Sequence, residues 1–310
     1  MDKNQFEVIV LGAGPAGLTA GIYLGRSKVN TLILDTGAAG GQMVLTYEVA
    51  NYPGVKNISG YQLSSIMKNQ AKSFGCTIKT GIKIEEMQLD GSTKKIRLSN
   101  GQEYTSKSII LATGGRSRML NVPGEEEFKG RGISYCATCD GDFFQDKEIV
   151  VVGGGNSALE EAVALTKYAS KVTILHEFDH FQAFQHAVEE AQKHPKIDFI
   201  MTSHITRFFG DEKLKGIQYK NLQTGEEKEM PIDGVFIFIG YEANTQSLQN
   251  GMVKLNQWNE VITDEKLQTN LNGVFAAGDC RAKRYRQITT AVADGTIAAL
   301  NAMEYVNKLK

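Results

Sequence analysis

Residues 6–17 read Phe-Glu-Val-Ile-Val-Leu-Gly-Ala-Gly-Pro-Ala-Gly, and this stretch decides the fold. The apolar run predicts a short buried strand, and the glycine-rich turn after it leads into a helical pattern. A second apolar run, Thr31 to Leu34, ends at Asp35. Strand, glycine-rich turn, helix, strand and acid in this order predict one βαβ unit with a nucleotide-binding fingerprint.

Each glycine of this fingerprint has a separate physical task. Gly12 lets the strand turn sharply, Gly14 leaves room for a pyrophosphate to reach the backbone, and Gly17 permits close helix–strand packing. The start of the helix offers free N–H groups and a positive dipole end to phosphate. Asp35 follows Gly12 by 23 residues, where a carboxylate can accept a hydrogen bond from a ribose hydroxyl.

The same pattern returns later in the chain. A strand-like run at 148–152 leads into Gly153-Gly154-Gly155-Asn156-Ser157-Ala158, followed by a helical stretch at 159–168 and a strand at 172–175. Further strands are expected at 109–111, 235–239 and 274–277, and a helix in about the last sixteen residues. The predicted fold class is α/β, with two Rossmann-like (βαβ) nucleotide-binding domains, the second inserted in the first.

The chain is expected to cross between these domains near 115–118 and near 240–246. Residues 1–115 and 246–310 then form one discontinuous domain, and residues 116–245 form the inserted domain. The length of 310 residues suits two domains of ordinary size.

The composition excludes several classes of protein. The 34 Lys and Arg residues nearly balance 35 Asp and Glu residues, which argues against a nucleic-acid binder. No apolar run is long enough to span a bilayer, and the charged start at 1–7 has no secretory pattern, so we expect a cytoplasmic protein without a membrane partner.

Two of the four cysteines form a close pair in the segment Cys136-Ala137-Thr138-Cys139-Asp140. This spacing suits a redox-active dithiol that can close a tight disulfide. A zinc site would need a second Cys/His pair, which the sequence does not offer, so we predict no metal. Asp140 could give or take a proton during thiol–disulfide exchange, or simply begin a helix. Cys76 and Cys280 are expected to be small buried residues.

Together these motifs resemble the low-molecular-weight thioredoxin reductases over nearly the whole chain. The C-A-T-C-D segment just before the second glycine fingerprint is highly specific to that family. The matching segments are Gly12–Gly17, Gly40–Gln42, Asn51–Gly54, Ala112–Gly114, Cys136–Asp140, Gly153–Ala158, Gly273–Asp279 and Arg286–Gln287.

The resemblance implies a homodimer in which the discontinuous domain binds FAD. It implies that Cys139 lies next to the flavin, that Cys136 attacks the disulfide of thioredoxin, and that Asp140 is the acid/base. The FAD-binding residues that it implies are Gly12, Gly14, Ala16, Gly17, Asp35, Gly41, Gln42, Asn51, Gly114, Gly278, Asp279, Arg286 and Gln287.

The sequence departs from the family pattern after the second strand of the inserted domain. NADPH-dependent members carry His-Arg-Arg-x-x-x-Arg there, and the arginines bind the 2′-phosphate. This chain has His176, but Glu177, Phe178 and Gln182 replace the three arginines. Glu177 and Asp179 would repel a phosphate dianion, so NADPH is not the expected donor.

Two interpretations of the electron donor remain. In one, Glu177 binds a ribose hydroxyl and the enzyme uses NADH. In the other, the aromatic residues Phe178, Phe181 and Phe184 fill the site with His186, and ferredoxin is the donor. The segment 176–186 also resembles a pyridine-nucleotide-independent subgroup of flavin-linked ferredoxin–thioredoxin reductases, and we favour ferredoxin.

Other features of the sequence have simpler alternatives. The spacing of Phe178, Phe181 and Phe184 is by itself typical of a helix face in the core. The basic segment 281–286, like Arg116 and Arg118, could dock an acidic partner, but a solvated loop or a flavin-phosphate contact explains it more simply.

Two other functions compete with the main hypothesis. A ferredoxin–NADP⁺ reductase on the same scaffold would lack the cysteine pair that this chain has. A flavin-binding redox sensor without turnover would not need Asp140 beside that pair.

Overall fold

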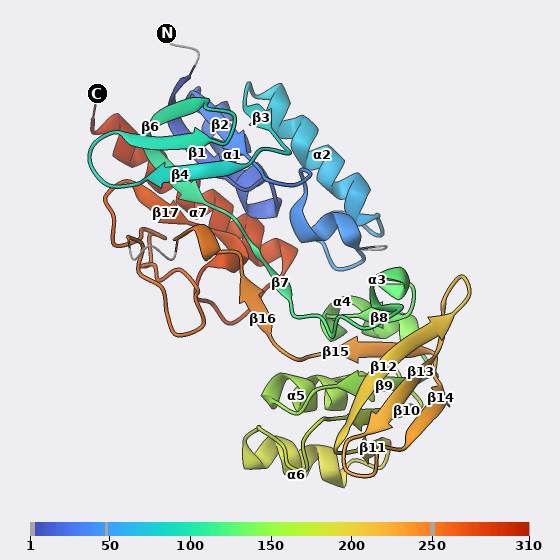
Figure 1. Ribbon diagram of the computed structural model, residues 1–310. Coiled ribbons are helices and arrows are strands. Elements are labelled where there is room, and N and C mark those ends of the chain that lie inside the picture. Colours follow the sequence, from blue (N-terminus) through green and yellow to red (C-terminus); the bar gives the residue numbers. More distant parts are fainter. Residues whose placement is uncertain (1–3, 47–48, 249–251, 310) are drawn as a thin grey trace. The chain divides into compact units, whose positions relative to one another are not determined.

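The computed structural model describes residues 4–46, 49–248 and 252–309. They form two compact units, one built from the chain up to Arg116 and again from Glu242 onward, the other from Ser117–Tyr241 (Figure 1). The chain crosses between the units at β7 (Gly115–Ser117) and β16 (Tyr241–Ala243), which pair with each other. The strands of both main sheets are largely parallel, and helices pack on them, which confirms the predicted α/β class.

The first unit is built on a sheet in the order β3-β2-β1-β6-β5-β4, with β17 also paired to β6. Strands β1, β2, β3, β6 and β17 run parallel, while β4 and β5 are antiparallel additions at one edge. Its strands are β1 (Gln5–Leu11), β2 (Thr31–Leu34), β3 (Thr77–Lys79), β4 (Ile84–Gln88), β5 (Lys94–Leu98), β6 (Glu103–Leu111) and β17 (Val274–Ala276).

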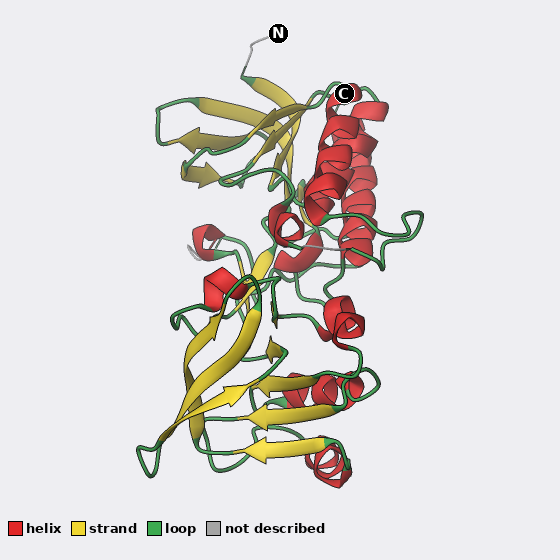
Figure 2. Ribbon diagram, turned by 90° about the vertical axis from the view of Figure 1, so that its right-hand side faces the viewer, coloured by secondary structure: helices red, strands yellow, loops and turns green. Residues whose placement is uncertain are grey.

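Successive side chains of β1 point to opposite faces of the sheet, and they contribute to two separate layers of the core of this unit. Val8 and Val10 pack against α1 (Pro15–Arg26) and α7 (Ile288–Asn307), two long helices that lie side by side (Figure 2). Ile9 and Leu11 face the opposite layer, which includes β5. The remaining helices are α2 (Gly60–Ser73) and the 3₁₀ turns η1 (Gly41–Leu45), η3 (Gln246–Leu248) and η4 (Gly278–Cys280).

The second unit repeats this layering around a parallel sheet in the order β11-β10-β9-β15-β8. In β9, Ile149 and Val151 pack under α5 and α6, whereas Val150 and Val152 pack under the antiparallel sheet of β12, β13 and β14. Its elements are α3 (Glu125–Phe128), β8 (Ile133–Ser134), α4 (Ala137–Asp140), η2 (Gly141–Phe144), β9 (Glu148–Val152), α5 (Asn156–Leu165), β10 (Lys171–Leu175), α6 (Gln185–Lys193), β11 (Ile197–Ile200), β12 (Ser203–Gly210), β13 (Leu214–Asn221), β14 (Glu227–Pro231) and β15 (Gly234–Ile237).

Candidate active site

The first glycine fingerprint forms the turn between β1 and α1. A Cβ at Gly12, where φ is +111°, would lie 2.1 Å from the carbonyl oxygen of Ala112, and one at Gly17 would lie 1.9 Å from that of Gly12. The packing of the chain itself therefore excludes side chains at both positions. A Cβ at Gly14 would have no neighbour closer than the Cα of Gly41 at 3.9 Å. Gly14 thus leaves a side-chain-sized space above the turn that the protein does not fill.

Three other segments meet this turn. A Cβ at Gly278 would lie 2.9 Å from the Cβ of Ala16, and one at Gly295 in α7 would lie 2.2 Å from the Ala16 carbonyl oxygen. The N–H of Gly40 donates to the carbonyl oxygen of Ala13 at 2.7 Å, which places the 40–41 turn beside the fingerprint. The structure therefore joins the predicted cofactor residues at 12–17, 41 and 278 in one place.

Asp35 lies at the end of β2, where the sequence places it. Its Oδ2 accepts the N–H of Ala13 at 2.5 Å, and its Oδ1 accepts the N–H of Gly37 at 2.7 Å. Each carboxylate oxygen can accept a second hydrogen bond. Asp35 can therefore hold the turn and still accept a bond from a ribose hydroxyl.

The other residues predicted on this unit are less closely tied to the fingerprint. Gln42 and Asn51 have exposed side chains, and no hydrogen bond within the described residues links either of them to residues 12–17. Gly114 adopts a φ of +66° with open space around the position of a Cβ. The grouping of these three around a cofactor stays a prediction.

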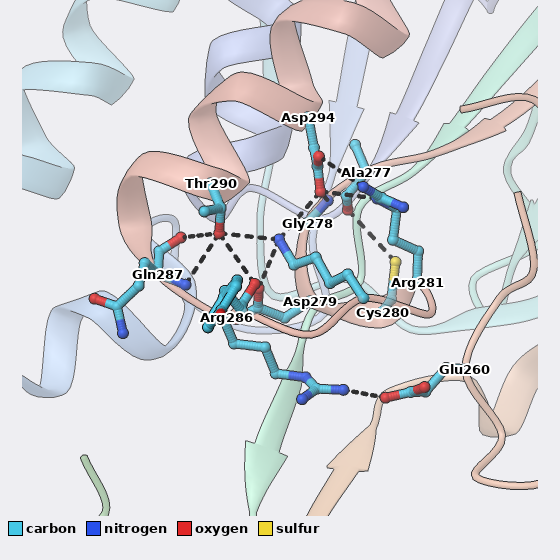
Figure 3. A network of polar contacts seen from close by, with 12 residues as sticks. Glu260, Ala277, Gly278, Asp279, Cys280, Arg281, Arg286, Gln287, Thr290 and Asp294 are labelled. Carbon is cyan, nitrogen blue, oxygen red and sulfur yellow. Dashed lines mark hydrogen bonds and ion pairs between the residues drawn. The ribbon is translucent and has the colours of Figure 1, made fainter. Parts of the chain in front are cut away.

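A buried network of charges surrounds Asp279, as Figure 3 shows. Asp294 of α7 accepts the N–H of Gly278 at 3.1 Å and two bonds from the Arg281 guanidinium at 2.9 and 3.1 Å. The Nζ of Lys283 lies 3.1 Å from Asp294 Oδ2 and 3.2 Å from Asp279 Oδ1. Lys283 therefore links the two carboxylates, and Asp294 fixes the backbone of the 278–280 turn.

Burial and charge act in opposite directions on these two carboxyl groups. Burial raises the pKa of Asp279 above its ordinary value, although Lys283 acts to lower it. Burial also acts to raise the pKa of Asp294, but the Arg281 hydrogen bond and the Lys283 charge outweigh it, so this pKa lies below its ordinary value. Asp294 is therefore the firmly ionised member of the pair.

The basic segment 281–286 is not an exposed docking patch. The side chains of Arg281 and Lys283 are 20% and 7% exposed and pair with Asp294, and Arg286 forms an ion pair with Glu260. Arg284, which packs over Tyr285, is exposed. The interpretation of this segment as a solvated loop is therefore also wrong, because most of its cations neutralise buried acids. Gln287 forms a capping box with Thr290 at the start of α7.

The network predicts a pH-dependent loss of stability in Asp294→Asn. Removing this charge leaves Arg281 without its carboxylate partner and leaves the buried Lys283 with Asp279 alone, which costs about 3 kcal/mol near neutral pH. Because the pKa of Asp294 is lowered by folding, its contribution exists above the unfolded-state pKa and is lost as pH falls through the folded-state pKa. Calorimetric unfolding of wild type and variant should therefore differ at pH 7 and converge in acid; an equal difference at every pH would contradict the assignment.

The predicted redox pair is closed as a disulfide in the second unit. The sulfur atoms of Cys136 and Cys139 are 2.14 Å apart, and their Cα atoms are 5.3 Å apart. Cys136 is the N-cap of α4, and its Sγ accepts the N–H of Cys139 at 3.2 Å. Both residues are partly exposed. The sequence prediction of a redox-capable pair is confirmed in its geometry.

Asp140 ends α4 directly after Cys139. Its N–H donates to the carbonyl oxygen of Cys136 at 3.2 Å, and its Oδ2 accepts the hydroxyl of Ser134 at 2.5 Å. Burial raises the pKa of Asp140 above the ordinary value; the Ser134 hydrogen bond lowers it, and the Asp142 charge raises it further. A carboxyl with a raised pKa can hold a proton closer to neutral pH, as an acid/base group requires.

The second glycine fingerprint, between β9 and α5, is contacted by the segment 176–184 of its own chain. The N–H of Gln182 donates to the carbonyl oxygen of Gly154 at 2.8 Å, and the N–H of Phe184 donates to Asn156 Oδ1 at 2.7 Å. The buried imidazole of His176 lies over Gly154: a Cβ added at Gly154 would be 2.3 Å from the Nε2 atom of His176. The segment therefore runs directly along this turn.

The helical interpretation of the phenylalanine stripe is wrong. Residues 176–184 form an irregular segment, and α6 begins only at Gln185. Phe181 packs on His176 and on the core, but Phe178 and Phe184 are 40% and 64% exposed. The i, i+3, i+6 spacing misled because Gln182 and Phe184 give their backbone N–H groups to the glycine turn instead of to a helix.

The positions of the three replaced arginines are open to solvent. Glu177, Phe178 and Gln182 are all exposed, and the exposed Asp179 pairs with His180 at 2.7 Å. A 2′-phosphate at this place would therefore meet carboxylates instead of guanidinium groups.

Sequence reasoning missed several residues that support both sites. Ser134 is buried and contacts Asp140. The buried side chain of Lys283 contacts Asp279 and also pairs with the buried Asp294. The carboxylate of Glu125, which is 1% exposed, accepts the hydroxyl of Tyr135 at 2.8 Å, next to Cys136. The sequence offered a signal for Ser134 alone, because a serine two residues before Cys136 is close enough in the chain to reach the cysteine pair.

Within residues 4–46, 49–248 and 252–309, no cluster of three His, Cys, Asp or Glu side chains is arranged to hold a metal ion. Over the same residues, no helix combines the length and the apolar character that a membrane span requires.

The chain belongs to the pyridine nucleotide-disulphide oxidoreductase family, whose model matches residues 6–295. It is similar to the thioredoxin reductase of Listeria monocytogenes, at 46% identity over 310 residues that cover 100% of this chain and 96% of that protein. It is also similar to the "34.2 kDa protein in rubredoxin operon" of Clostridium pasteurianum, at 44% identity over 98% of each chain. The crystal structure of thioredoxin reductase from Streptococcus pyogenes matches it with a TM-score of 0.95 and 37% identity, over 99% of this chain and 100% of that one.

Proposed function

We propose that this protein is a flavin-dependent thioredoxin reductase. The observation that carries the proposal is the closed Cys136–Cys139 disulfide at the start of α4, with the partly buried Asp140 beside it. A purely structural disulfide needs neither an acid group beside it nor exposure to solvent, whereas this one has Asp140 beside it and lies in partly exposed residues. Thioredoxin reductases that share more than two fifths of its residues along the full chain support the same substrate.

FAD fits the first unit on two observations. Gly14 leaves an unfilled space where a pyrophosphate can approach the backbone, at the start of the twelve-residue helix α1. Asp35 retains free acceptor capacity at the end of β2 for a ribose, as in other dinucleotide sites. When bound, FAD would collect electrons from a donor and supply them to the disulfide as a pair.

We assign the sulfur chemistry to Cys136, Cys139 and Asp140. In the reduced protein, the Cys136 thiolate attacks the disulfide of thioredoxin and forms a mixed disulfide, and the Cys139 thiolate then attacks Cys136. The two sulfurs return to the disulfide seen here, and thioredoxin leaves as a dithiol. Asp140 supplies the first proton to the leaving thiolate.

Ferredoxin is the donor that we favour. The exposed segment 176–184 carries Glu177 and Asp179 where NADPH would need cations, and its backbone contacts the second glycine turn. NADH is the alternative, because Glu177 is exposed and could accept bonds from a ribose hydroxyl. The homodimer and the cytoplasmic location stay predictions from the sequence and its resemblance.

The purified protein is expected to be yellow and to release one FAD per chain on acid denaturation. After chemical reduction and removal of the reductant, it should convert oxidised thioredoxin to the dithiol, measured by alkylation and mass spectrometry. A colourless chain, or a yellow chain that leaves thioredoxin oxidised, would contradict the proposal. A blank with the flavin alone controls for direct transfer to thioredoxin.

A further inference from the structure

Ser134 occupies the centre of the redox segment, although it is neither a cysteine nor the acid. It lies in β8, where it pairs with Phe236 of β15, and its side chain is 4% exposed. Its hydroxyl accepts the N–H of Cys136 at 3.1 Å and lies 2.5 Å from Asp140 Oδ2. The Cys136 carbonyl oxygen is a second possible acceptor at 3.3 Å. One rigid side chain thus contacts both the attacking cysteine's backbone and the acid.

A count of hydrogens assigns the direction of these bonds. A serine hydroxyl has one hydrogen to donate and two lone pairs with which to accept. Since the Cys136 N–H can only donate, the hydroxyl accepts there and can give its hydrogen to Asp140. The contact to Oδ2 is much shorter than that to the Cys136 carbonyl oxygen, so Oδ2 takes this hydrogen. A proton on the Asp140 carboxyl is then left to Oδ1.

We propose that Ser134 is a positioning residue of the reductase reaction: its hydroxyl holds Oδ2 of Asp140, so that Oδ1 carries the proton exchanged with the sulfurs. This inference rests on the proposed function and adds a residue to it. The same bond stabilises the ionised carboxylate, and so Ser134 lowers the pKa of Asp140 against the larger, raising effect of burial.

The reaction balances with this assignment. Cys136 sulfur forms a bond to one thioredoxin sulfur, the thioredoxin disulfide breaks, and the leaving thiolate takes the proton from Oδ1. Cys139 then loses its proton to Oδ1, attacks Cys136 and releases the second thioredoxin sulfur, which takes that proton. One electron pair moves from the two enzyme sulfurs to thioredoxin, and the two protons come from Asp140 and Cys139.

The charged groups around Asp140 offer a control variant that should shift the pKa of Asp140 in the direction opposite to Ser134→Ala. The elements packed against α4 carry Asp142, in η2, and Glu160 and Glu161, in α5. Of these, Asp142 acts on Asp140, and it raises the pKa of that carboxyl. Its side chain is exposed, so Asp142→Asn removes the charge without disturbing the core. Ser134→Ala and Asp142→Asn should therefore move the titration of Asp140 in opposite directions.

The first experiment is an infrared pH titration of the oxidised protein, which needs neither a donor nor a partner. The carboxyl band of Asp140 is identified as the band that disappears in Asp140→Asn. In Ser134→Ala its midpoint should rise by about one pH unit, since a hydrogen bond to a charged group favours the ionised form by that order. Ser134→Thr should stay at the wild-type midpoint because it keeps a hydroxyl, and Asp142→Asn should fall below it.

The second experiment follows the reaction itself. Pre-reduced variants are mixed with oxidised thioredoxin across a pH series, and the high-pH decline in rate should move up by about one unit in Ser134→Ala. With an aromatic disulfide such as 5,5′-dithiobis(2-nitrobenzoate), whose leaving thiolate is stable without a proton, the same variant should react like wild type.

The outcomes separate the two claims. An unmoved carboxyl band in Ser134→Ala, or a uniform loss of rate at all pH values with both disulfides, would overturn the role of Ser134. A shifted band in a protein whose wild type leaves thioredoxin oxidised would support the coupling of Ser134 to Asp140 and would count against the proposed function instead.

Discussion

Replacing Cys139 by serine is expected to reduce the steady-state rate of thioredoxin reduction by about 10³-fold or more, because the nucleophile that resolves the mixed disulfide is removed. The structure places the two sulfurs in bonding contact, with Cys136 at the N-cap of α4. The variant should instead accumulate a covalent complex between Cys136 and thioredoxin, detectable by mass spectrometry. Steady-state kinetics with a saturating donor would measure the loss.

Cysteine substitutions elsewhere provide the matched control. Cys76 and Cys280 are buried free thiols, and burial raises the pKa of Cys76 to about 11, so it is protonated at neutral pH. Cys76→Ser should therefore retain turnover, and its covalent complex with thioredoxin should be absent. Full turnover in Cys139→Ser, or an equal loss in both variants, would contradict the assignment of the redox pair.

The second large effect concerns the electron donor. Flavin reduction in a stopped-flow instrument should be at least about 10²-fold faster with reduced ferredoxin than with NADPH, since like charges in such a site cost several kcal/mol. The driving force suffices: a ferredoxin near −400 mV and thioredoxin near −270 mV differ by about 130 mV, or about 6 kcal/mol for two electrons. Rapid bleaching by micromolar NADH would contradict the ferredoxin proposal and would favour the role of Glu177 in binding a ribose.

A variant that carries arginines at the three replaced positions tests directly whether charge is the reason that NADPH is a poor donor. E177R/F178R/Q182R changes three exposed positions, so it should fold as the wild type does. It should bind the 2′-phosphate of NADPH more tightly than the wild type, while its reaction with ferredoxin stays unchanged. Equal NADPH affinity in both proteins would show that the segment 176–184 excludes the nucleotide by its backbone contacts instead of by its charge.

The sequence predicted the local parts of the fold accurately. Strands β2 and β9 have the predicted bounds, and β1 begins one residue earlier, at Gln5. These strands are buried on both faces, so they appear in the sequence as continuous apolar runs. A glycine turn or an acidic residue directly after each run marks where the strand ends. The structure divides the chain after Arg116 and before Glu242. The predicted division into a cofactor-binding domain and an inserted domain stays a prediction.

The first residues of the helices were predicted less well, because polar cap and first-turn residues do not belong to the periodic apolar pattern from which a helix is predicted. Helix α5 begins at Asn156 instead of Leu159, and α7 begins at Ile288, well before the helical pattern becomes clear. In α7, Gln287 and Thr290 supply the cap, and Thr-rich first turns carry no strong periodic signal.

The redox segment was predictable because its reactive residues are adjacent in the chain. Cys136, Cys139 and Asp140 are neighbours, so their grouping could be read from spacing. Lys283 and Asp294 meet across a turn and a helix, and their charges cancel inside the fold, which a count of basic residues cannot show.

The central claim is that a bound flavin and the Cys136–Cys139 disulfide form one electron path to thioredoxin. The most direct test is an anaerobic reductive titration of the purified protein, with C136S/C139S as the comparison. We predict that the wild type takes up four electrons per chain, two in the flavin and two in the disulfide, and that the variant takes up two. Uptake of two electrons by both proteins, with the disulfide of the wild type still closed at the end point, would contradict it.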